Sequence, residues 1–388
     1  MNRYRSVTVV SDGDGYVLGR RESAEFVSVP EIGGQVMLWL QQGHPIDDVA
    51  ARAGELAGQD VDVLDFLATL EDAGVLVAGE DDDAGPDGKP FGQSFGRIVF
   101  GPAGMLVQLA IVLAGSVLLV RRPELRPTYH DYVPFSAPLA SLLTTMLLSL
   151  SLAVIHEMAH KLGAARLGLS ARISFGRRLF FIVAQTDLTG LWALPRRQRF
   201  LPLAAGMLSN LAIAALVVFV QVWWGDSLGA TATAIARAVV MINVGSIIAQ
   251  SAVYLRTDFY AILLVISGSR NLWALKGALA RQLIRRPTPD DSALIENSRR
   301  AEIWWARCYL VLYLPGIAMA VWFYLRFSLR ATLKVIRMAW DALTQSGISP
   351  TAAGAAVALL LIVIPTSIGL FGAARSGVAV LRRAARPA

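Results

Sequence analysis

Residues 132–160 read YVPFSAPLASLLTTMLLSLSLAVIHEMAH, and this stretch decides the fold. The part from Tyr132 to Ile155 carries no charged side chain and is long enough to cross a bilayer, which takes roughly 20 helical residues. It runs directly into His156-Glu157-Met158-Ala159-His160. Ionisable groups at the end of a membrane helix are costly unless they are paired or bind a metal. The stretch therefore predicts a transmembrane helix that carries a metal site.

The rest of the chain has a membrane composition. It has 388 residues, of which 55% are hydrophobic and 17% charged, and its mean hydropathy is +0.51. Five further apolar stretches are long enough, or nearly so, to span a bilayer: Ile98 to Val120, Phe200 to Gly225, Ala238 to Leu255, Cys308 to Leu325, and a span within Ala342 to Ala374. We expect an α-helical polytopic membrane protein with about six transmembrane helices, and a membrane domain over residues 98–388.

Charge divides the chain into two parts. Residues 1–90 hold 6 Lys/Arg and 18 Asp/Glu, a net −12, and residues 91–388 hold 30 and 11, a net +19, which sum to the overall +7. A nucleic-acid-binding module must neutralise phosphates with Lys and Arg, so the acidic first part excludes that class of partner. The basic second part fits Lys and Arg that flank membrane spans. Its partner is the lipid bilayer.

The loops predict the orientation in the cell membrane. The N-terminus lacks the apolar run of a signal peptide, so we expect it in the cytosol. Six spans then place 20 Lys/Arg in internal loops and the tail, against 7 outside, in agreement with the positive-inside rule. Both termini and the His156 end of the helix are expected on the cytosolic side.

Residues 1–79 predict a small α+β domain. Strands are expected at Ser6 to Val10, Tyr16 to Arg20 and Glu25 to Val29, and helices at Pro30 to Gln42, Ile46 to Leu56 and Val61 to Ala73. Gly43, Gly58 and Gly74 are placed as helix stop signals, and Asp60 as an N-cap. Residues 80–97 begin with an acidic, Gly- and Pro-containing run typical of a linker.

The order of these elements resembles the PqqD-like domain, also called the precursor-peptide recognition element, a small winged-helix-like fold. The resemblance includes Leu38-Trp39-Leu40 before Gly43 and the segment Phe66 to Leu76. It implies that a leader peptide adds as a strand beside Glu25 to Val29, over the face of Val61 to Ala73. The alternative is a small acidic regulatory or folding domain without a ligand.

The motif His156-Glu157-Met158-Ala159-His160 predicts a zinc site. Positions i and i+4 share one face of a helix, so both imidazoles can reach one metal ion, and Glu157 beside them can act on a metal-bound water. The alternatives are a structural metal site or a proton relay in a transporter. Catalytic zinc commonly has three protein ligands, and no His follows His160. Among Asp187, Asp226, Asp258 and Glu302, we expect Asp258 as the third ligand, because it ends the fourth span at the same membrane face.

These elements resemble the three-helix core of the site-2 protease family of intramembrane zinc metallopeptidases, over residues 134–266. The second element is Ala205-Gly206-Met207-Leu208-Ser209-Asn210 and the third is Leu255-Arg256-Thr257-Asp258-Phe259-Tyr260. This chain departs from the family pattern at Met207 and Phe259, and Gln250 stands where an Asn is expected.

The resemblance and the chemistry together imply a zinc metalloendopeptidase. One Zn²⁺ held by His156, His160 and Asp258 would activate water, and Glu157 would take its proton and pass it to the leaving amine. Asn210 is expected to hydrogen-bond the oxyanion or the substrate backbone, with Asn243 as an alternative, or to join two helices instead.

Two loop segments also carry expectations. Arg172 to Gly176 and Leu179 to Gln185 predict a hairpin beside the active site, which could bind an extended substrate, or else form an ordinary cytosolic connection. Arg326 to Met338 is amphipathic and predicts an external helix lying at the membrane surface.

Both halves together predict a protease that binds a precursor peptide by its leader and cleaves it during maturation of a ribosomally synthesised, modified peptide. One alternative is site-2-type cleavage of a transmembrane regulator such as an anti-sigma factor. A second is a peptide transporter or immunity protein without hydrolytic activity.

Overall fold

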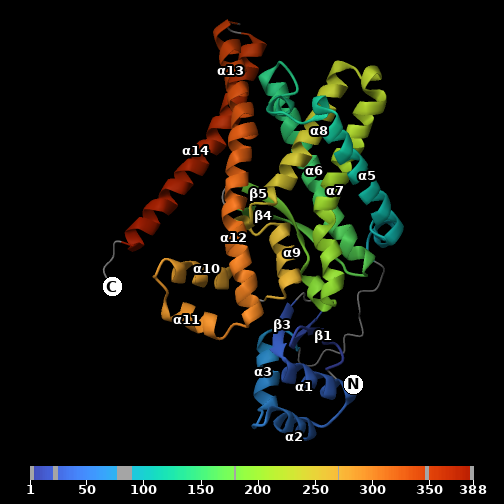
Figure 1. Cartoon of the computed structure of the whole chain (residues 1–388), viewed down its shortest axis with the longest axis vertical. Coiled ribbons are helices and arrows are strands. Elements are labelled where there is room, and N and C mark those ends of the chain that lie inside the picture. Colours follow the sequence, from blue (N-terminus) through green and yellow to red (C-terminus); the bar gives the residue numbers. More distant parts are fainter. Residues whose placement is uncertain are drawn as a thin grey trace.

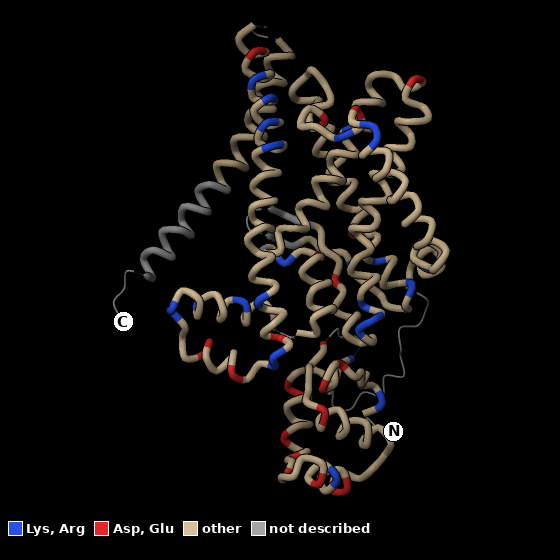
Figure 2. Tube along the Cα trace, viewed as in Figure 1, with Lys and Arg blue, Asp and Glu red and all other residues tan. Residues whose placement is uncertain are grey.

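The computed structural model describes residues 4–20, 25–76, 90–178, 181–269, 271–345 and 349–384. It consists of a small α+β domain and a bundle of long helices, and the small domain lies below the bundle in Figure 1. Acidic residues predominate in the small domain, whereas Lys and Arg gather where the helices approach it and along one upper helix (Figure 2). The two parts predicted from charge are therefore two structural units.

The small domain is a three-stranded antiparallel sheet covered by three helices. Its elements are β1 (Thr8–Asp12), β2 (Gly15–Arg20), β3 (Glu25–Pro30), α1 (Glu31–Gln42), α2 (Ile46–Ala57) and α3 (Val63–Asp72), and the strand order is β1-β2-β3. All six predicted elements are present, within two residues at each end. Leu18, Met37, Leu40 and Leu70 are fully buried between the sheet and the helices and form the centre of its core.

The helix ends of this domain follow the predicted stop signals. Gly43 and Gly58 adopt φ of 92° and 66° at the ends of α1 and α2, the left-handed conformation that glycine adopts without a Cβ clash. The predicted cap at Asp60 is wrong: Asp62 caps α3 and its side chain accepts from the Asp65 amide. Of the predicted linker, residues 80–89 lie outside the described residues, and the remainder leads into α4 (Gln93–Val99).

Six helices are long and apolar enough to cross a membrane, as predicted. They are α5 (Pro102–Arg121), α6 (Pro138–Arg166), α7 (Arg196–Trp224, extended by η4, Gly225–Ser227), α8 (Ala230–Ala249), α12 (Arg300–Phe323, continued below) and α14 (Pro350–Ala384, apolar to Ile368). α5 leaves nearly its whole apolar surface exposed, which suits a helix in contact with lipid. The chain is a helical membrane protein.

The helix predicted at Arg326 to Met338 is present, but it is not separate from the fifth span. α12 passes through a π-helical turn, η6 (Tyr324–Ser328), into α13 (Leu329–Gln345) without a break. The apolar stripe of α13 is buried within the protein: Ala331 and Val335 pack with Val133. A strongly amphipathic helix needs an apolar partner, and here other helices supply it.

Short elements fill the loops. They are η1 (Pro123–Leu125), η2 (Tyr129–Tyr132), β4 (Arg172–Arg178), β5 (Phe181–Asp187), η3 (Thr189–Ala193), η5 (Val253–Leu255), α9 (Asp258–Ser267), α10 (Leu272–Leu283) and α11 (Pro289–Glu296). β4 and β5 form the predicted antiparallel hairpin. The fourth apolar stretch ends earlier than expected, because α8 stops at Ala249 and the chain turns before α9 begins.

Ion pairs join the small domain to the helical bundle. Asp12, at the end of β1, accepts from Arg199 of α7 at 2.9 Å, and Arg196 lies 3.6 Å from the same carboxylate. Asp14 in the β1–β2 turn pairs with Arg299 before α12. Arg199 is only 2% exposed, so the contact with Asp12 lies inside the interface. Buried pairs of this kind hold a fixed geometry because a broken pair would leave an uncompensated charge.

Candidate metal centre

His156 and His160 project from one face of α6, one turn apart, as their spacing predicted. Their Nε2 atoms lie 3.2 Å from each other. The two residues are 8% and 3% exposed, so the imidazoles are removed from solvent. Buried polar groups in a membrane helix need partners, and the partners of the two imidazoles come from α7 and α9.

Asp258 completes the cluster from the first position of α9. Its Oδ2 atom lies 2.9 Å from His156 Nε2 and 3.3 Å from His160 Nε2. Arg256 just before it adopts φ of 53°, and this turn brings α9 back towards α6. Gln250, at the end of α8, donates from Nε2 to Asp258 Oδ2 at 3.1 Å and accepts from the Asp258 amide at 3.0 Å. The carboxylate is therefore held from two sides.

The opposite ring nitrogens of both histidines meet oxygen acceptors on α7. His156 Nδ1 lies 3.3 Å from Asn210 Oδ1, and His160 Nδ1 lies 2.8 Å from the carbonyl of Pro202. An Nδ1–H directed at these oxygens leaves each Nε2 with a free lone pair. Asn210 in turn donates to Ser246 Oγ of α8 at 2.7 Å. Such outer contacts fix the orientation and tautomer of metal-binding histidines.

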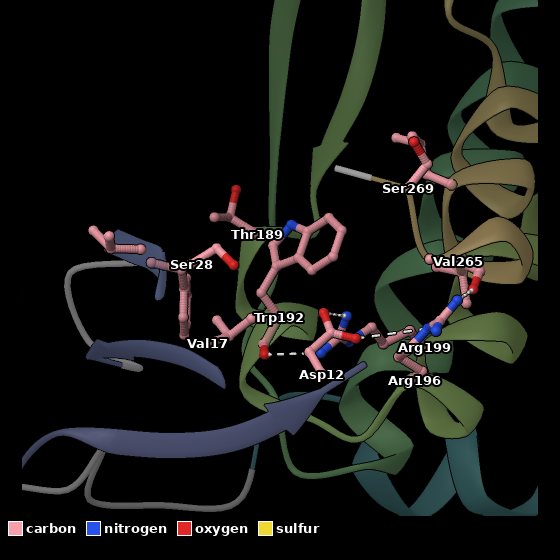
Figure 3. Close-up of a pocket in the computed structure, with 13 residues that line it drawn as sticks. Asp12, Val17, Ser28, Thr189, Trp192, Arg196, Arg199, Val265 and Ser269 are labelled. Atoms are coloured by element: carbon pink, nitrogen blue, oxygen red, sulfur yellow. Dashed lines mark hydrogen bonds and ion pairs between the residues drawn. The ribbon is translucent and has the colours of Figure 1, made fainter. Parts of the chain in front are cut away.

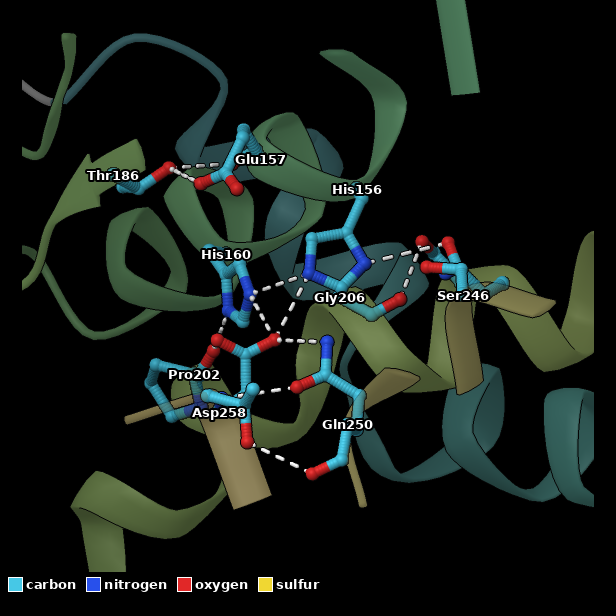
Figure 4. A network of polar contacts seen from close by, with 12 residues as sticks. His156, Glu157, His160, Thr186, Pro202, Gly206, Ser246, Gln250 and Asp258 are labelled. Carbon is cyan, nitrogen blue, oxygen red and sulfur yellow. Dashed lines mark hydrogen bonds and ion pairs between the residues drawn. The ribbon is translucent and has the colours of Figure 1, made fainter. Parts of the chain in front are cut away.

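The cluster of donor atoms suits zinc. Two imidazole nitrogens and one carboxylate oxygen converge on one point, and all ligand atoms of the group lie within 4.8 Å of one another (Figure 4). The 2.9, 3.2 and 3.3 Å separations resemble the roughly 3.3 Å between neighbouring ligands in a tetrahedral zinc site with bonds of about 2.0 Å. Three protein ligands leave a fourth position for water or substrate.

Gly206 of α7 faces the two histidines directly. A Cβ at this position would lie 2.5 Å from both His156 Nε2 and His160 Nε2, closer than any real contact of this kind. The clash is with the two ligand atoms themselves. The close approach of α7 to the cluster therefore requires a glycine.

We expect Gly206→Ala to weaken zinc binding at least about tenfold, because the added methyl group displaces the ligand nitrogens, and disturbed ligand geometry costs about 10–100-fold. Zinc content after equilibration with a competing chelator measures the effect. Gly225→Ala, at the end of the same helix and in open space, is the matched control and should bind zinc as the wild type does. Equal affinity in Gly206→Ala would contradict a metal site at this position.

Glu157 lies beside the cluster and contacts the hairpin. Thr186 Oγ1 of β5 lies 2.8 Å from Glu157 Oε2 and 2.9 Å from the Glu157 carbonyl. In Figure 4 the carboxylate points towards Thr186, while the two imidazoles face Asp258. A hydroxyl that donates to this carboxylate restricts its orientation. The hairpin is thus hydrogen-bonded to Glu157, the residue that directly follows the ligand His156.

The structure brings together His156, His160, Asp258 and Asn210, with Glu157 next to them. The other acids considered as a third ligand are engaged elsewhere: Asp187 accepts from Thr189, and Glu302 pairs with Arg299. Asn243, the alternative to Asn210, donates to the Val239 carbonyl within α8.

Sequence reasoning assigned no role to several supporting residues, namely Thr186, Pro202, Gly206, Ser246 and Gln250, although it noted Gly206 and Gln250. Two of them left a signal. Gly206 lies in the small-residue segment before Asn210, and Gln250 precedes Asp258 by eight positions. The Pro202 carbonyl is a backbone group, so the pattern of side chains in the sequence cannot predict its contact with His160.

No protein-family model matches the chain, and the searches of curated proteins and of solved structures return no match.

Proposed function

We propose that this chain is an intramembrane zinc metalloendopeptidase. One observation carries the proposal. The Nε2 atoms of His156 and His160 and the Oδ2 atom of Asp258 lie within 3.3 Å of one another at the end of a membrane helix, and Glu157 is adjacent in sequence. A purely structural zinc site is usually closed by four protein ligands, whereas this group offers three. The arrangement also agrees with the three-helix core of the site-2 protease family that the motifs resemble.

The residues take separate roles in this proposal. His156, His160 and Asp258 hold the ion, which when bound would make water ionise near neutral pH and polarise a peptide carbonyl. Glu157 takes a proton from the attacking water and returns it to the nitrogen of the departing amine as the C–N bond breaks. Gln250 and the Pro202 carbonyl hold Asp258 and His160 in position.

Asn210 is assigned a positioning role instead of the oxyanion role expected from sequence. Its Oδ1 faces His156 Nδ1 and its Nδ2 donates to Ser246, so both ends of the amide are engaged inside the bundle. It is 2% exposed. A side chain in this position orients His156 and links α7 to α8.

The proposed substrate is a precursor peptide that the small domain binds by its leader. The support is the arrangement of strands and helices in residues 8–72, which agrees with the PqqD-like resemblance, and the free edge of β3, which pairs with β2 alone within the described residues. We propose that both termini face the cytosol, because Lys and Arg gather at the end of the bundle where the small domain docks and α14 runs towards that same side (Figures 1 and 2).

Co-expression tests this function. The full-length chain is produced with a short precursor peptide encoded beside its gene, and mass spectrometry identifies new termini. Cleavage that requires Glu157 supports the proposal. Cleavage of a co-expressed transmembrane regulator alone would favour the regulatory alternative, and function that survives in Glu157→Gln would favour a transporter or immunity protein.

Thr186 provides a further test of the site. We expect Thr186→Val to lower the cleavage rate about tenfold without changing zinc content, because Glu157 loses the hydroxyl that orients it, and hydrogen bonds to charged groups contribute about 1.5–3 kcal/mol. Thr186→Ser keeps the hydroxyl and should retain activity. A split of kinetic constants, with kcat reduced and KM unchanged, distinguishes this role from a general loosening of the hairpin. Full activity in Thr186→Val would contradict it.

A further inference from the structure

Two adjoining cavities extend from the small domain to the hairpin that contacts Glu157. The first, the interdomain cavity, has a volume of about 260 Å³ and lies between the sheet and the bundle (Figure 3). The second, the hairpin cavity, has a volume of about 480 Å³ and is lined by Ser174, Gln185 and Thr186 of the hairpin. Both cavities share Thr189, Trp192, Arg199, Leu264 and Val265 as lining residues. Thr186 lines the hairpin cavity and donates to Glu157, so this cavity adjoins the hydrogen bond that orients Glu157.

The outer face of the sheet forms one wall of the interdomain cavity. Val17 and Ser28 are cross-strand partners on β2 and β3, and Phe26 follows at the next position on the same face. Leu18 and Val29 point to the other face and are buried against the helices of the small domain. In Figure 3, Ser28 faces Thr189 and Trp192 across the cavity.

The charged groups that line this cavity are two arginines and one aspartate, which leave a net charge of +1. Arg199 pairs with Asp12, donates to the Leu194 carbonyl at 2.8 Å and stacks its guanidinium 4.7 Å from the centre of the Trp192 ring. Arg196 lies near the same carboxylate and donates to the Val265 carbonyl at 2.7 Å. The cavity therefore presents apolar walls, hydroxyl groups and a net positive charge to an occupant.

One buried polar atom in the wall lacks a partner. Ser269 lines the interdomain cavity and is 5% exposed, and within the described residues its Oγ has no hydrogen bond. A buried hydroxyl without a partner is costly and uncommon. A ligand with its own donors and acceptors would satisfy it, as a peptide backbone does.

We propose that the interdomain cavity is a binding subsite for an extended stretch of peptide without basic side chains. This inference rests on the proposed function. The stretch is the part of the substrate that lies between the leader segment bound by the small domain and the peptide bond to be cleaved beside Glu157. Apolar walls accept uncharged side chains, and the hydroxyls of Ser28, Thr189 and Ser269 accept from or donate to backbone groups. A Lys side chain would be desolvated there next to a net positive charge.

Cysteine protection tests the subsite independently of hydrolysis. In full-length protein with Cys308→Ser, the variant Ser28→Cys is labelled with a neutral maleimide in the presence of the uncharged peptide acetyl-Thr-Val-Thr-Val-Thr-Val-amide. We expect labelling to slow at least about fivefold at millimolar peptide. The Lys-containing analogue acetyl-Thr-Lys-Thr-Lys-Thr-Lys-amide should give no protection. Ser11→Cys, an exposed strand serine outside the lining of either cavity, is the matched control and should label at an unchanged rate.

Ser269→Ala keeps the shape of the wall and removes the unpartnered hydroxyl. Added to the Ser28→Cys protein, it should weaken protection about fivefold or more, since a lost hydrogen bond is worth about that factor. Equal protection by both peptides, or none by the uncharged peptide up to about 10 mM, would overturn the subsite. Protection without any cleavage of co-expressed precursor would leave the subsite standing and count against the proposed hydrolysis.

Discussion

Glu157→Gln should abolish peptide cleavage while leaving zinc in place. We expect the rate to fall about 10³-fold, because the amide cannot take a proton from water, and general acid–base catalysis contributes about 10²–10⁴-fold. The substitution preserves the shape of the side chain, and its amide oxygen can still accept from Thr186 Oγ1. Among the described residues, the Glu157 side chain hydrogen-bonds to Thr186 and not to a ligand atom, so the affinity for zinc should stay within about twofold of the wild type.

The control for this experiment is Glu124→Gln. Glu124 is an exposed acid in η1, far along the chain from the cluster, and its replacement should alter neither zinc content nor cleavage. Mass spectrometry of the co-expressed precursor gives the activity, and elemental analysis of the purified protein gives the metal. Cleavage by Glu157→Gln at more than about a tenth of the wild-type rate would exclude Glu157 as the proton acceptor.

The part of the site that follows from helical geometry could be predicted from sequence. His156 and His160 share a face because a helix turns once in 3.6 residues, and this holds whatever surrounds them. Asp258 could be placed because few acids lie near the spans and the second and fourth spans run in the same direction. The boundaries of the sheet and helices in the small domain also followed from local pattern and from Gly43 and Gly58.

The remaining features depend on packing between distant segments. The carbonyl of Pro202, the hydroxyl of Ser246 and the hydroxyl of Thr186 act on the cluster through their positions in other elements, and common residue types carry no sign of this. The same holds for α13: its amphipathic pattern predicts an apolar partner but does not say whether lipid or protein provides it. Asn210 forms the hydrogen bond between helices that was the alternative to a contact with substrate, because its amide nitrogen donates to Ser246 of α8.

Replacement of Asp258, the proposed third ligand, should lower the affinity for zinc more than any other substitution considered. We expect Asp258→Asn to weaken zinc binding by at least about 100-fold. Loss of a residue that only hydrogen-bonds a ligand costs about 10–100-fold, and loss of the ligand itself should cost more. The carboxylate is the one anionic member of the group, and its Oδ2 contacts both imidazoles. Gln250→Ala removes a donor to that oxygen and should cost about tenfold, since Asp258 stays in place but is held less firmly.

Asp187→Asn is the matched control, because Asp187 was an alternative ligand from the loop next to the same site. Its carboxylate accepts from the Thr189 amide and hydroxyl, so its replacement should leave zinc affinity unchanged. Chelator competition and thermal unfolding of the purified full-length protein separate lost affinity from lost folding. Because ligands must be deprotonated to bind, the affinity of the wild type should also fall as the pH drops. Loss of zinc in Asp187→Asn with retention in Asp258→Asn would place the third ligand in the hairpin loop. Asp258 would then be a hydrogen-bond partner of the two histidines and not a ligand.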